Sequence, residues 1–486
     1  MLALCSALFS LTPVSPPQDA AAARLEMQPV EIALPDGGHA TAWRGMLRVP
    51  IVRADPASKE IGVDVWQFKA VEGAPPGRPP VFLLHGGPGW PGLQPSSIDW
   101  EGEVAPRIAH ADLVIVGQRG IGTSEPNTSC AAFARPVDPD LPDDERAAAL
   151  RAQCAECRTH WESQGYDLAG FNVIEAAADV DDVRQMLGYS KIALFGGSFG
   201  SHWAMAVMRF HPDSVARAVL HGMEGPDHTY DPPGGLLAVL ERIATEAQAS
   251  AELAGKLPDE GLVEALRTVI RAVDEDPFPY QVDGVEVPID GDGLRELALG
   301  YTARVNSRDS VGGWPADVMR LYEGDFEAAA RAILRGRRGT GFLPTASFFG
   351  LDCGSGITRE RLERYRSDPA VEVVGDPTWF YEAACPAWGA DLGDDFRTGF
   401  QSSIPTLIVH GTWDVSTPLE NALELLPLFE RAHFVPVEGG THGALGEAVR
   451  HDPTFRAALD AFLVDGATDG LPEAVALPPI AWTASW

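Results

Sequence analysis

The sequence is poor in basic residues, has few cysteines and has no long apolar run. Its 486 residues include 37 Lys and Arg against 69 Asp and Glu, which gives a formal net charge of −32. A surface of that charge repels phosphate groups, so we expect no nucleic-acid partner and no binding to anionic membranes. A cationic ligand fits the charge, although a purely solubilising surface is the alternative. No stretch reaches the roughly 18 apolar residues of a membrane-spanning helix.

The six cysteines are too few for a small disulfide scaffold, but five of them follow the first 27 residues. Cys154 and Cys157 are spaced i, i+3 in a stretch with helical character. We expect Cys130 to bond to one of this pair and Cys353 to bond to Cys385, which leaves one free thiol. The alternative is a zinc site formed by Cys130, Cys154, Cys157 and His160, for which a lone Cys-x-x-Cys is weak evidence.

Residues 1–27 look like a secretory signal. A short apolar run, Leu2 to Leu11, is followed by prolines and by Ala20 to Ala23. The basic residues that normally begin such a signal are missing, so a disordered leader on a cytoplasmic protein is the alternative. We expect an exported protein, periplasmic or secreted, in which both disulfides can form.

Six short apolar runs without polar alternation predict strands that are buried on both faces, and therefore a mostly parallel sheet covered by helices. The runs cover residues 80–84, 113–116, 191–195, 215–220, 405–409 and 433–437. Apolar residues at helical spacing lie between them, at 174–187, 419–429 and 455–462. This βαβα order predicts an α/β fold.

The strand–helix order is interrupted once, where helical segments dominate, for example at 236–254, 261–273 and 326–334. We expect a helical cap that is inserted over the strand ends. The predicted organisation is a leader at 1–27, a first part of the core at 28–226, the cap at 227–400, and a second part of the core at 401–486. The last segment ends in a Pro-rich tail.

The predicted strands end at residues that carry chemistry, and parallel strands bring these ends to one edge of the sheet. The clearest end is Gly196-Gly197-Ser198-Phe199-Gly200, a G-x-S-x-G between a buried strand and an apolar helix. Such a turn holds the serine in strained dihedrals, and Gly196 and Gly200 avoid a collision where strand and helix cross. We predict that Ser198 is a nucleophile.

A serine hydroxyl needs a base to take its proton and a carboxylate to orient that base. In this order of elements the acid and then the histidine follow the serine. Asp414 follows the fifth apolar run and His442 follows the sixth. We predict a catalytic triad of Ser198, Asp414 and His442. The other candidates for the acid are Asp391, Asp394 and Asp395.

A tetrahedral intermediate also needs N–H donors for its oxyanion. One expected donor is the backbone of Phe199, directly after the nucleophile. The loop at residues 85–89, His-Gly-Gly-Pro-Gly, follows the first apolar run. Its glycines let backbone N–H groups approach an oxygen, and we favour Gly87. The alternative is that this loop is only a tight turn.

These motifs together resemble the α/β-hydrolase family of proline iminopeptidases and tripeptidyl aminopeptidases. The resemblance is carried by residues 85–89, Gln118 to Ser124, the Ser198 turn, Asp414 with Thr417-Pro418, and His442. It covers roughly residues 40–225 and 400–465, and the insertion matches only in position and helical character. It implies a serine exopeptidase that acts at a free peptide N-terminus beneath a helical cap. Gly117 stands where the family usually has Asp, which changes the bonding of that loop and not the triad.

An aminopeptidase must bind a protonated amine, for which a carboxylate is the natural partner. Glu224 lies just beyond the fourth apolar run. We predict that it anchors the amine, with Asp227 or Asp231 assisting; the alternative is a solvated loop acid. Aromatic residues of the insertion either line an apolar pocket or pack the cap: Phe278, Tyr280, Trp314, Phe348, Phe349, Trp379, Phe380, Tyr381 and Trp388.

The sequence therefore predicts a serine hydrolase, an aminopeptidase that takes small peptides with a free N-terminus and works through an acyl-enzyme without cofactor or metal. An esterase or small-molecule acyl hydrolase with the same triad is one alternative. A non-catalytic binding protein that kept the fold is the other. The sequence does not indicate an oligomeric state.

Overall fold

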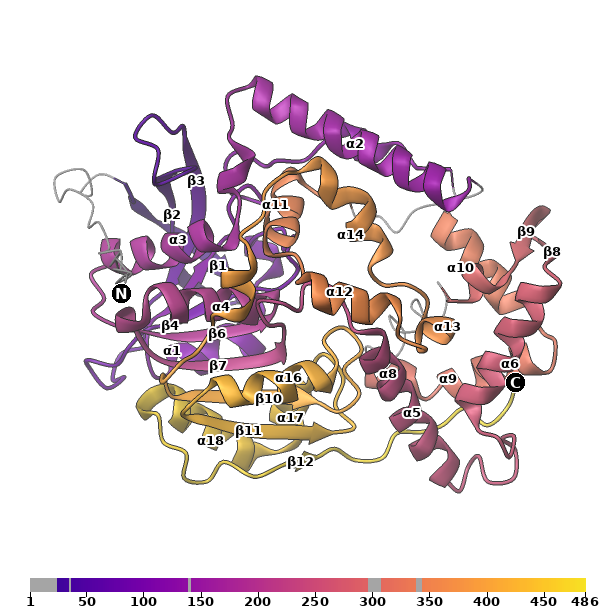
Figure 1. Ribbon diagram of the computed structural model, residues 1–486. Helices are drawn as coiled ribbons and strands as arrows, with labels where there is room; N and C mark the ends of the chain where they lie inside the picture. Colours follow the sequence, from indigo (N-terminus) through magenta and orange to yellow (C-terminus); the bar gives the residue numbers. More distant parts are fainter. Residues whose placement is uncertain (1–23, 35, 139–140, 296–306, 338–342) are drawn as a thin grey trace, which may run out of the picture.

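The computed structural model describes residues 24–34, 36–138, 141–295, 307–337 and 343–486 (Figure 1). The predicted leader lies almost entirely outside these residues. A ten-stranded sheet has the order β1-β2-β3-β5-β4-β6-β7-β10-β11-β12. Its strands are β1 (Met27–Ala33), β2 (His39–Pro50), β3 (Glu60–Phe68), β4 (Val81–Leu84), β5 (Leu113–Val116), β6 (Ile192–Ser198), β7 (Val215–Met223), β10 (Thr406–Gly411), β11 (Ala432–Glu438) and β12 (Val475–Ala476).

The six predicted apolar runs are strands, as expected. They form β4 to β7, β10 and β11, and every pair between β5 and β12 in the sheet order is parallel. Strands β1, β2 and β3 extend the sheet in antiparallel fashion. The parallel strands all end at the same edge, where the site residues lie.

Helices cover both faces of the sheet. Phe82 and Leu84 pack in one apolar cluster with α3 (Val173–Met186), α4 (Phe199–Phe210) and α16 (Leu419–Leu425). Val81 and Leu83, which point the other way along the same strand, pack in a second cluster. That cluster includes residues of α1 (Ala105–Ile108), α17 (Ala444–His451) and α18 (Pro453–Asp465). Because both faces are buried, the strands read as unbroken apolar runs in the sequence.

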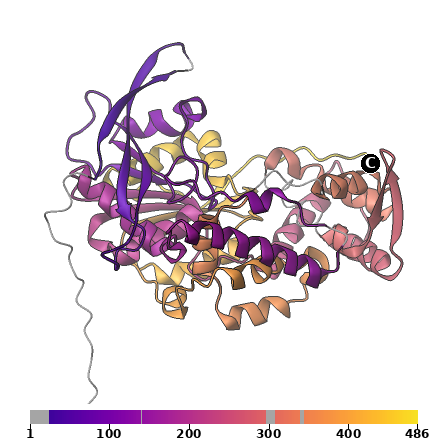
Figure 2. The same cartoon turned by 90° about the horizontal axis from the view of Figure 1, so that it is seen from above.

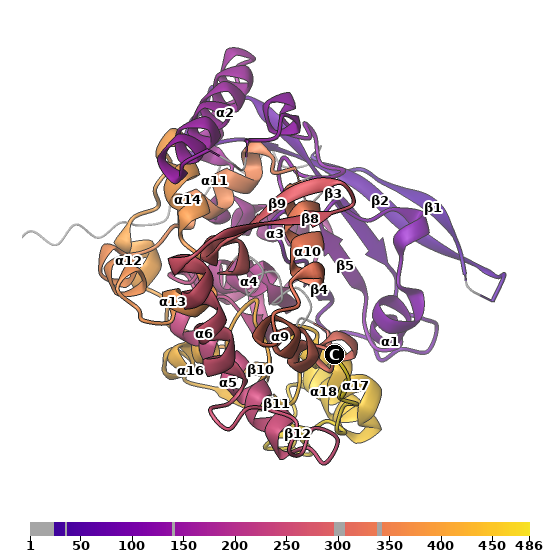
Figure 3. The same ribbon diagram turned by 90° about the vertical axis from the view of Figure 1, so that its right-hand side faces the viewer.

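The segment 227–400 is largely helical. Its elements are α5 (Pro233–Ala249), α6 (Leu262–Glu275), β8 (Phe278–Val282), β9 (Val285–Ile289), α8 (Arg308–Val311), α9 (Trp314–Tyr322), α10 (Glu327–Arg337), α11 (Ala346–Ser355), α12 (Arg359–Arg366), α13 (Val371–Val374), α14 (Trp379–Ala384) and α15 (Asp394–Thr398). α5, α6, α9 and α10 gather with the hairpin beside the sheet, as Figures 2 and 3 show, and share an apolar cluster. α11 instead packs in the cluster of the core.

The β8–β9 hairpin is a departure from the helical segments expected in the insertion. Asp283 and Gly284 form its turn, and both have positive φ, 51° and 76°. An Asp-Gly pair between alternating apolar residues is a strong hairpin signal. The apolar residues Val282, Val285 and Val287 flank this turn, so the sequence contains the signal for a hairpin. The helical spacing of apolar residues on either side led instead to the expectation of helices.

The C-terminal tail runs from β12 to the cap (Figure 1). Trp482 N–H donates to Glu252 at 2.8 Å, and Thr483 N–H donates to Gly312 O at 2.8 Å. The tail therefore ties the second part of the core to the inserted segment. In the part of the chain that the structure describes, no helix is both long and apolar enough to cross a membrane.

Candidate active site

Ser198 stands at a sharp turn between β6 and α4. Its φ is 57° and its ψ is −135°, which L-residues with a side chain rarely adopt. A Cβ on Gly196 would collide with Gly200 O, and a Cβ on Gly200 would collide with Leu84 O. Gly196 therefore permits the close approach of β6 and α4, as the sequence predicted, and Gly200 permits that of α4 and the end of the neighbouring strand β4.

The side chains of Asp414 and His442 are hydrogen-bonded to each other. His442 Nδ1 lies 3.0 Å from Asp414 Oδ1 and 2.9 Å from Oδ2. The Asp414 carboxylate is fully buried and also accepts the N–H groups of Ser416 and Thr417 at 2.9 Å and the Thr417 hydroxyl at 2.9 Å. The carboxylate is thus held in place and directed at the imidazole.

Asp414 and His442 each shift the pKa of the other. Burial tends to raise the pKa of Asp414, but the nearby His442, together with His410 and the Thr417 N–H, lowers it below its usual value. Burial tends to lower the pKa of His442, but the Asp414 carboxylate raises it above its usual value, with a smaller contribution from Asp231. The pair is therefore suited to a histidine that accepts a proton during the reaction.

The end of β7 connects the serine to the histidine. Ser198 is the register partner of Met223, and a Cβ on the preceding Gly222 would lie 3.0 Å from His442 Cε1. The structure thus brings Ser198, Asp414 and His442 to one edge of the sheet. The alternative acids Asp391 and Asp394 pair with Arg397 instead.

A second histidine, His410, is fully buried and braces this region. His410 Nδ1 accepts the Met223 N–H at 3.1 Å, so the proton of the neutral ring is on Nε2, which donates to Thr417 O at 2.8 Å. Burial lowers the pKa of His410 and favours this neutral form. His410 therefore links the end of β7 to the loop that carries Asp414.

The expected oxyanion donors lie beside the serine. Phe199 begins α4, directly after Ser198. A Cβ on Gly86 would lie 2.9 Å from Ser198 Cβ and 3.4 Å from its Oγ, so the backbone before Gly87 passes close to the hydroxyl. Gly87 has a φ of 113°, a conformation that favours glycine.

Gln118 holds this loop in shape. Its Nε2 donates to His85 O at 3.1 Å and to Gly86 O at 2.9 Å, and its Oε1 accepts the Gly89 N–H at 2.8 Å. Gln118 stands in the motif that carries the family resemblance, but its role as a brace could not be predicted from the sequence.

The departure at Gly117 has a structural counterpart. A Cβ at this position would lie 3.0 Å from Asp64 O on the neighbouring strand β3. The Asp64 side chain accepts hydrogen bonds from Trp66 Nε1 at 3.1 Å and from the Thr123 hydroxyl at 2.5 Å. This chain has glycine in place of the usual Asp at position 117, and the loop that follows is hydrogen-bonded to the Asp64 carboxylate of β3 instead.

Glu224 follows β7 and lies close to the Ser198 turn in the fold. Its side chain is 9% exposed, so it is not the solvated loop acid of the alternative. The Glu224 N–H donates to Ser201 Oγ at 2.9 Å, and Ser201 Oγ donates to Ser198 O at 2.7 Å. Two hydrogen bonds thus connect the backbone of Glu224 to that of Ser198.

Glu224 belongs to an acidic cluster with Asp231 and Asp352. Burial raises the pKa of Glu224 well above its usual value, and the two neighbouring acids raise it further. Burial also raises the pKa of Asp231 to about 7 and that of Asp352 to about 8. Among the described residues, none of the three forms an ion pair with Lys or Arg. The cluster therefore favours a cationic ligand.

Asp352 was not predicted, and Asp227 does not contribute as expected. The Asp352 side chain is 2% exposed, and its Oδ1 is buried without a hydrogen-bond partner. Asp227 bonds instead to Thr358 N–H at 2.6 Å and to Arg361 Nε at 2.8 Å. Asp227 therefore holds the start of α12, and Asp231 and Asp352 accompany Glu224.

The predicted aromatic residues divide between packing and the acidic cluster. Trp314 is buried in the apolar cluster of the cap, whereas Phe349 and Trp388 stack on each other in that of the core at 5.0 Å. Tyr381 differs from them, because its hydroxyl donates to Asp352 Oδ2 at 2.8 Å. The remaining aromatics mostly pack, which is the second of the two expectations.

The cysteines form the predicted disulfides. Cys130 bonds to Cys157, Cys353 bonds to Cys385, and Cys154 is free and buried. Burial raises the pKa of the Cys154 thiol to about 11. Within the described residues, no group of three or more His, Cys, Asp and Glu is arranged to hold a metal ion.

Two family models match the chain. A model described as the alpha/beta hydrolase fold matches residues 79–257, and one described as TAP-like protein matches residues 372–474. The tripeptidyl aminopeptidase of Streptomyces coelicolor is 24% identical over 466 residues, which are 87% of this chain and 81% of that protein.

Proline iminopeptidases match a shorter part. That of Neisseria gonorrhoeae is 31% identical over 160 residues, 33% of this chain and 37% of that protein. That of Arabidopsis thaliana is 32% identical over 151 residues, 31% of this chain and 28% of that protein. The chain thus spans only 37% and 28% of the length of these two proline iminopeptidases. Together with the sheet order and the Ser198 turn, these matches confirm the resemblance: the chain has the α/β-hydrolase fold, and its relatives include tripeptidyl aminopeptidases and proline iminopeptidases.

Proposed function

We propose that the chain is a serine aminopeptidase that releases one residue at a time from peptides with a free N-terminus. The observation that carries this proposal is the acidic cluster of the buried Glu224 and Asp352 and the half-buried Asp231, which follows β7 near the Ser198 turn. The raised pKa values of these acids mean that they hold protons more readily than ordinary carboxyl groups, and in the part of the chain that the structure describes none of them has a basic partner. A cation that joins them favours their ionised form. The protonated amine of a peptide is such a cation.

The chemistry follows from the triad. His442 takes the proton of Ser198, whose Oγ attacks the carbonyl carbon of the first peptide bond. The N–H groups of Phe199 and Gly87 stabilise the oxyanion, and Asp414 stabilises the imidazolium. His442 then gives the proton to the leaving amine, and the C–N bond breaks. Water, deprotonated by the same histidine, hydrolyses the acyl-enzyme and releases the residue.

The position of Glu224 supports release of a single residue. Met223 is the register partner of Ser198 on the neighbouring strand, and Glu224 is the next residue. In an aminoacyl group the amine nitrogen is about 2.5 Å from the carbonyl carbon, and each further residue adds about 3.5 Å. Asp231 is also close enough to His442 to raise its pKa. An amine held next to the strand end that carries the register partner of Ser198 favours the shortest acyl group, a single residue.

Export is part of this proposal. Two disulfides within the core and the inserted segment are typical of a protein that works in an oxidising compartment. A peptide substrate also suits a surface with a net charge of −32, since a protonated amine is attracted to it while polyanions are repelled.

The test is a panel of chromogenic aminoacyl, dipeptidyl and tripeptidyl amides, each with a free and an acetylated amine. We expect the free aminoacyl amides to have the highest kcat/KM. Preference for the tripeptidyl amides would keep the aminopeptidase and reject single-residue release. Hydrolysis of simple esters alone would favour the esterase. Failure of Ser198 to react with a fluorophosphonate would favour the non-catalytic alternative.

A further inference from the structure

Two helices of the inserted segment meet at the acidic cluster and are joined there by a disulfide. α11 carries Asp352 and, next to it, Cys353. α14 carries Tyr381 and ends directly before Cys385. The Cys353–Cys385 bond therefore crosses between the helices one residue from Asp352 and about one helical turn from Tyr381.

The same residues form a closed set of contacts. The Tyr381 hydroxyl donates to Asp352 Oδ2 at 2.8 Å. Tyr230, which follows β7 together with Glu224, stacks on the Tyr381 ring with centroids 4.5 Å apart and planes at 10°. The Tyr230 hydroxyl lies 3.7 Å from Cys385 Sγ. Tyr381 is thus held from one side by Tyr230 and from the other by the cross-linked helix.

One carboxylate oxygen of Asp352 accepts a hydrogen bond and the other accepts none. Tyr381 takes Oδ2, whereas Oδ1 is buried and has no hydrogen-bond partner. α11 itself is fixed to the core, because Ser355 Oγ lies 2.9 Å from His202 Nε2 and Ser347 N–H donates to Thr128 Oγ1 at 2.9 Å. The rotation of the Asp352 carboxylate therefore depends on Tyr381.

We propose that Tyr381 is a positioning residue, which directs Oδ1 of Asp352 at the substrate amine, and that the Cys353–Cys385 disulfide keeps Tyr381 in place. This inference rests on the proposed aminopeptidase function. The cross-link then contributes to recognition of the free amine as well as to stability. Tyr381 itself takes no part in the proton transfers of the triad.

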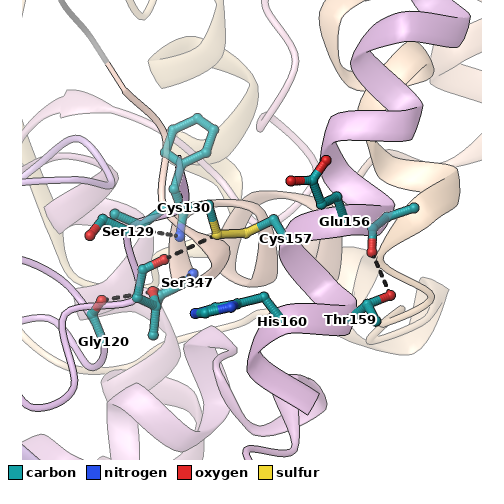
Figure 4. The surroundings of a disulfide bond; sticks show 12 residues. Gly120, Ser129, Cys130, Glu156, Cys157, Thr159, His160 and Ser347 are labelled. Atoms are coloured by element: carbon teal, nitrogen blue, oxygen red, sulfur yellow. Dashed lines mark hydrogen bonds between the residues drawn. A yellow bond between two sulfur atoms is a disulfide. The ribbon is translucent and has the colours of Figure 1, made fainter. Parts of the chain in front are cut away.

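The chain contains a matched control. The Cys130–Cys157 disulfide joins the segment between β5 and α2 to α2 (Asp143–Ser163) itself, as Figure 4 shows, and among the described residues neither cysteine is hydrogen-bonded to Asp352 or Tyr381. The two disulfides span 27 and 32 residues, so the loss of either one raises the chain entropy of the unfolded state by a similar amount. A general loss of stability therefore affects both pairs alike.

The experiment measures KM for a free aminoacyl amide and kcat/KM for p-nitrophenyl acetate, which has no amine. The variants are Tyr381→Phe, Cys353→Ser with Cys385→Ser, and the control Cys130→Ser with Cys157→Ser. We expect the first two to raise KM for the amide about tenfold and to leave hydrolysis of the acetate unchanged. The control pair should change neither value.

A pH profile separates positioning from packing. The Tyr381 hydrogen bond lowers the pKa of Asp352, which burial raises to about 8. Tyr381→Phe should therefore move the acid limb of kcat/KM for the amide to higher pH, while the profile for the acetate stays in place. An unchanged KM and acid limb in Tyr381→Phe would overturn the inference, even where the cysteine variants fail to fold. An equal rise in KM in both cysteine pairs would do the same. If the wild-type enzyme did not prefer free amines at all, the proposed function itself would fail.

Discussion

Asp414 and His442 follow the neighbouring parallel strands β10 and β11, and their side chains meet with 2.9 Å between Oδ2 and Nδ1. This bond places the imidazole proton on Nδ1 and leaves Nε2 free to accept the proton of a serine. The Asp414 carboxylate has three further donors from Ser416 and Thr417, so its orientation does not depend on the histidine.

Replacement of this carboxylate should therefore be severe. Asp414→Asn keeps the shape but reverses the tautomer that the histidine needs, and we expect kcat to fall by roughly 10³- to 10⁴-fold. Asp394→Asn is the matched control, since Asp394 was a candidate from the sequence and pairs with Arg397. Steady-state kinetics of both variants decide the assignment, and comparable losses in both would contradict it.

Glu224→Gln should weaken substrate binding and spare the chemistry. The amide has the size of the carboxylate but no charge, so the hydrogen bond to the ammonium loses most of its strength. We expect KM for a free aminoacyl amide to rise about 10- to 100-fold. Hydrolysis of p-nitrophenyl acetate, which carries no amine, is the internal control. An unchanged KM would remove Glu224 from the site.

Asp231 should affect the pH dependence of the triad. Its negative charge favours the imidazolium and contributes to the raised pKa of His442. Catalysis requires the neutral imidazole, so the rate rises with pH through this pKa. Asp231→Asn should lower the pKa and move the acid limb of kcat for p-nitrophenyl acetate to lower pH. A shift of the acid limb to higher pH, or no shift, would show that the charge of Asp231 does not raise the pKa of His442.

The Asp352 carboxyl group should destabilise the folded protein at neutral and basic pH. Burial raises its pKa to about 8, above the value of an unfolded chain, so the folded state keeps a proton that the unfolded state loses. Its contribution is fully present below pH 4 and is lost as pH rises towards 8. Asp352→Asn should therefore raise Tm by roughly a few °C at pH 8 and by less at pH 4. A lower Tm at pH 8 would contradict this.

Much of the core could be predicted because short-range rules determine it. The apolar runs are unbroken where strands are buried on both faces, and the turn at Ser198 requires glycine at 196 and 200 whatever the rest of the chain does. The chain order of Ser198, Asp414 and His442 then follows from the fold. These features need no knowledge of long-range contacts.

The acidic cluster could be predicted only in part. Glu224 stands next to a strand end and could be found, but Asp352 lies in a helix of the insertion, where no strand order fixes its position. Asp227 looked equivalent to Asp231 in the sequence, yet Arg361 and Thr358 occupy its carboxylate. Which of these two acids joins the cluster depends on contacts between side chains that are more than a hundred residues apart in the sequence.

The most direct test of the central claim compares one aminoacyl p-nitroanilide, such as the alanyl compound, with its N-acetyl derivative on the wild-type protein. An acidic cluster that binds the amine predicts a kcat/KM at least about 100-fold higher for the free amine, from the loss of one charged hydrogen bond and a buried ion pair. Equal rates for the two compounds, or faster hydrolysis of the acetylated one, would contradict the account.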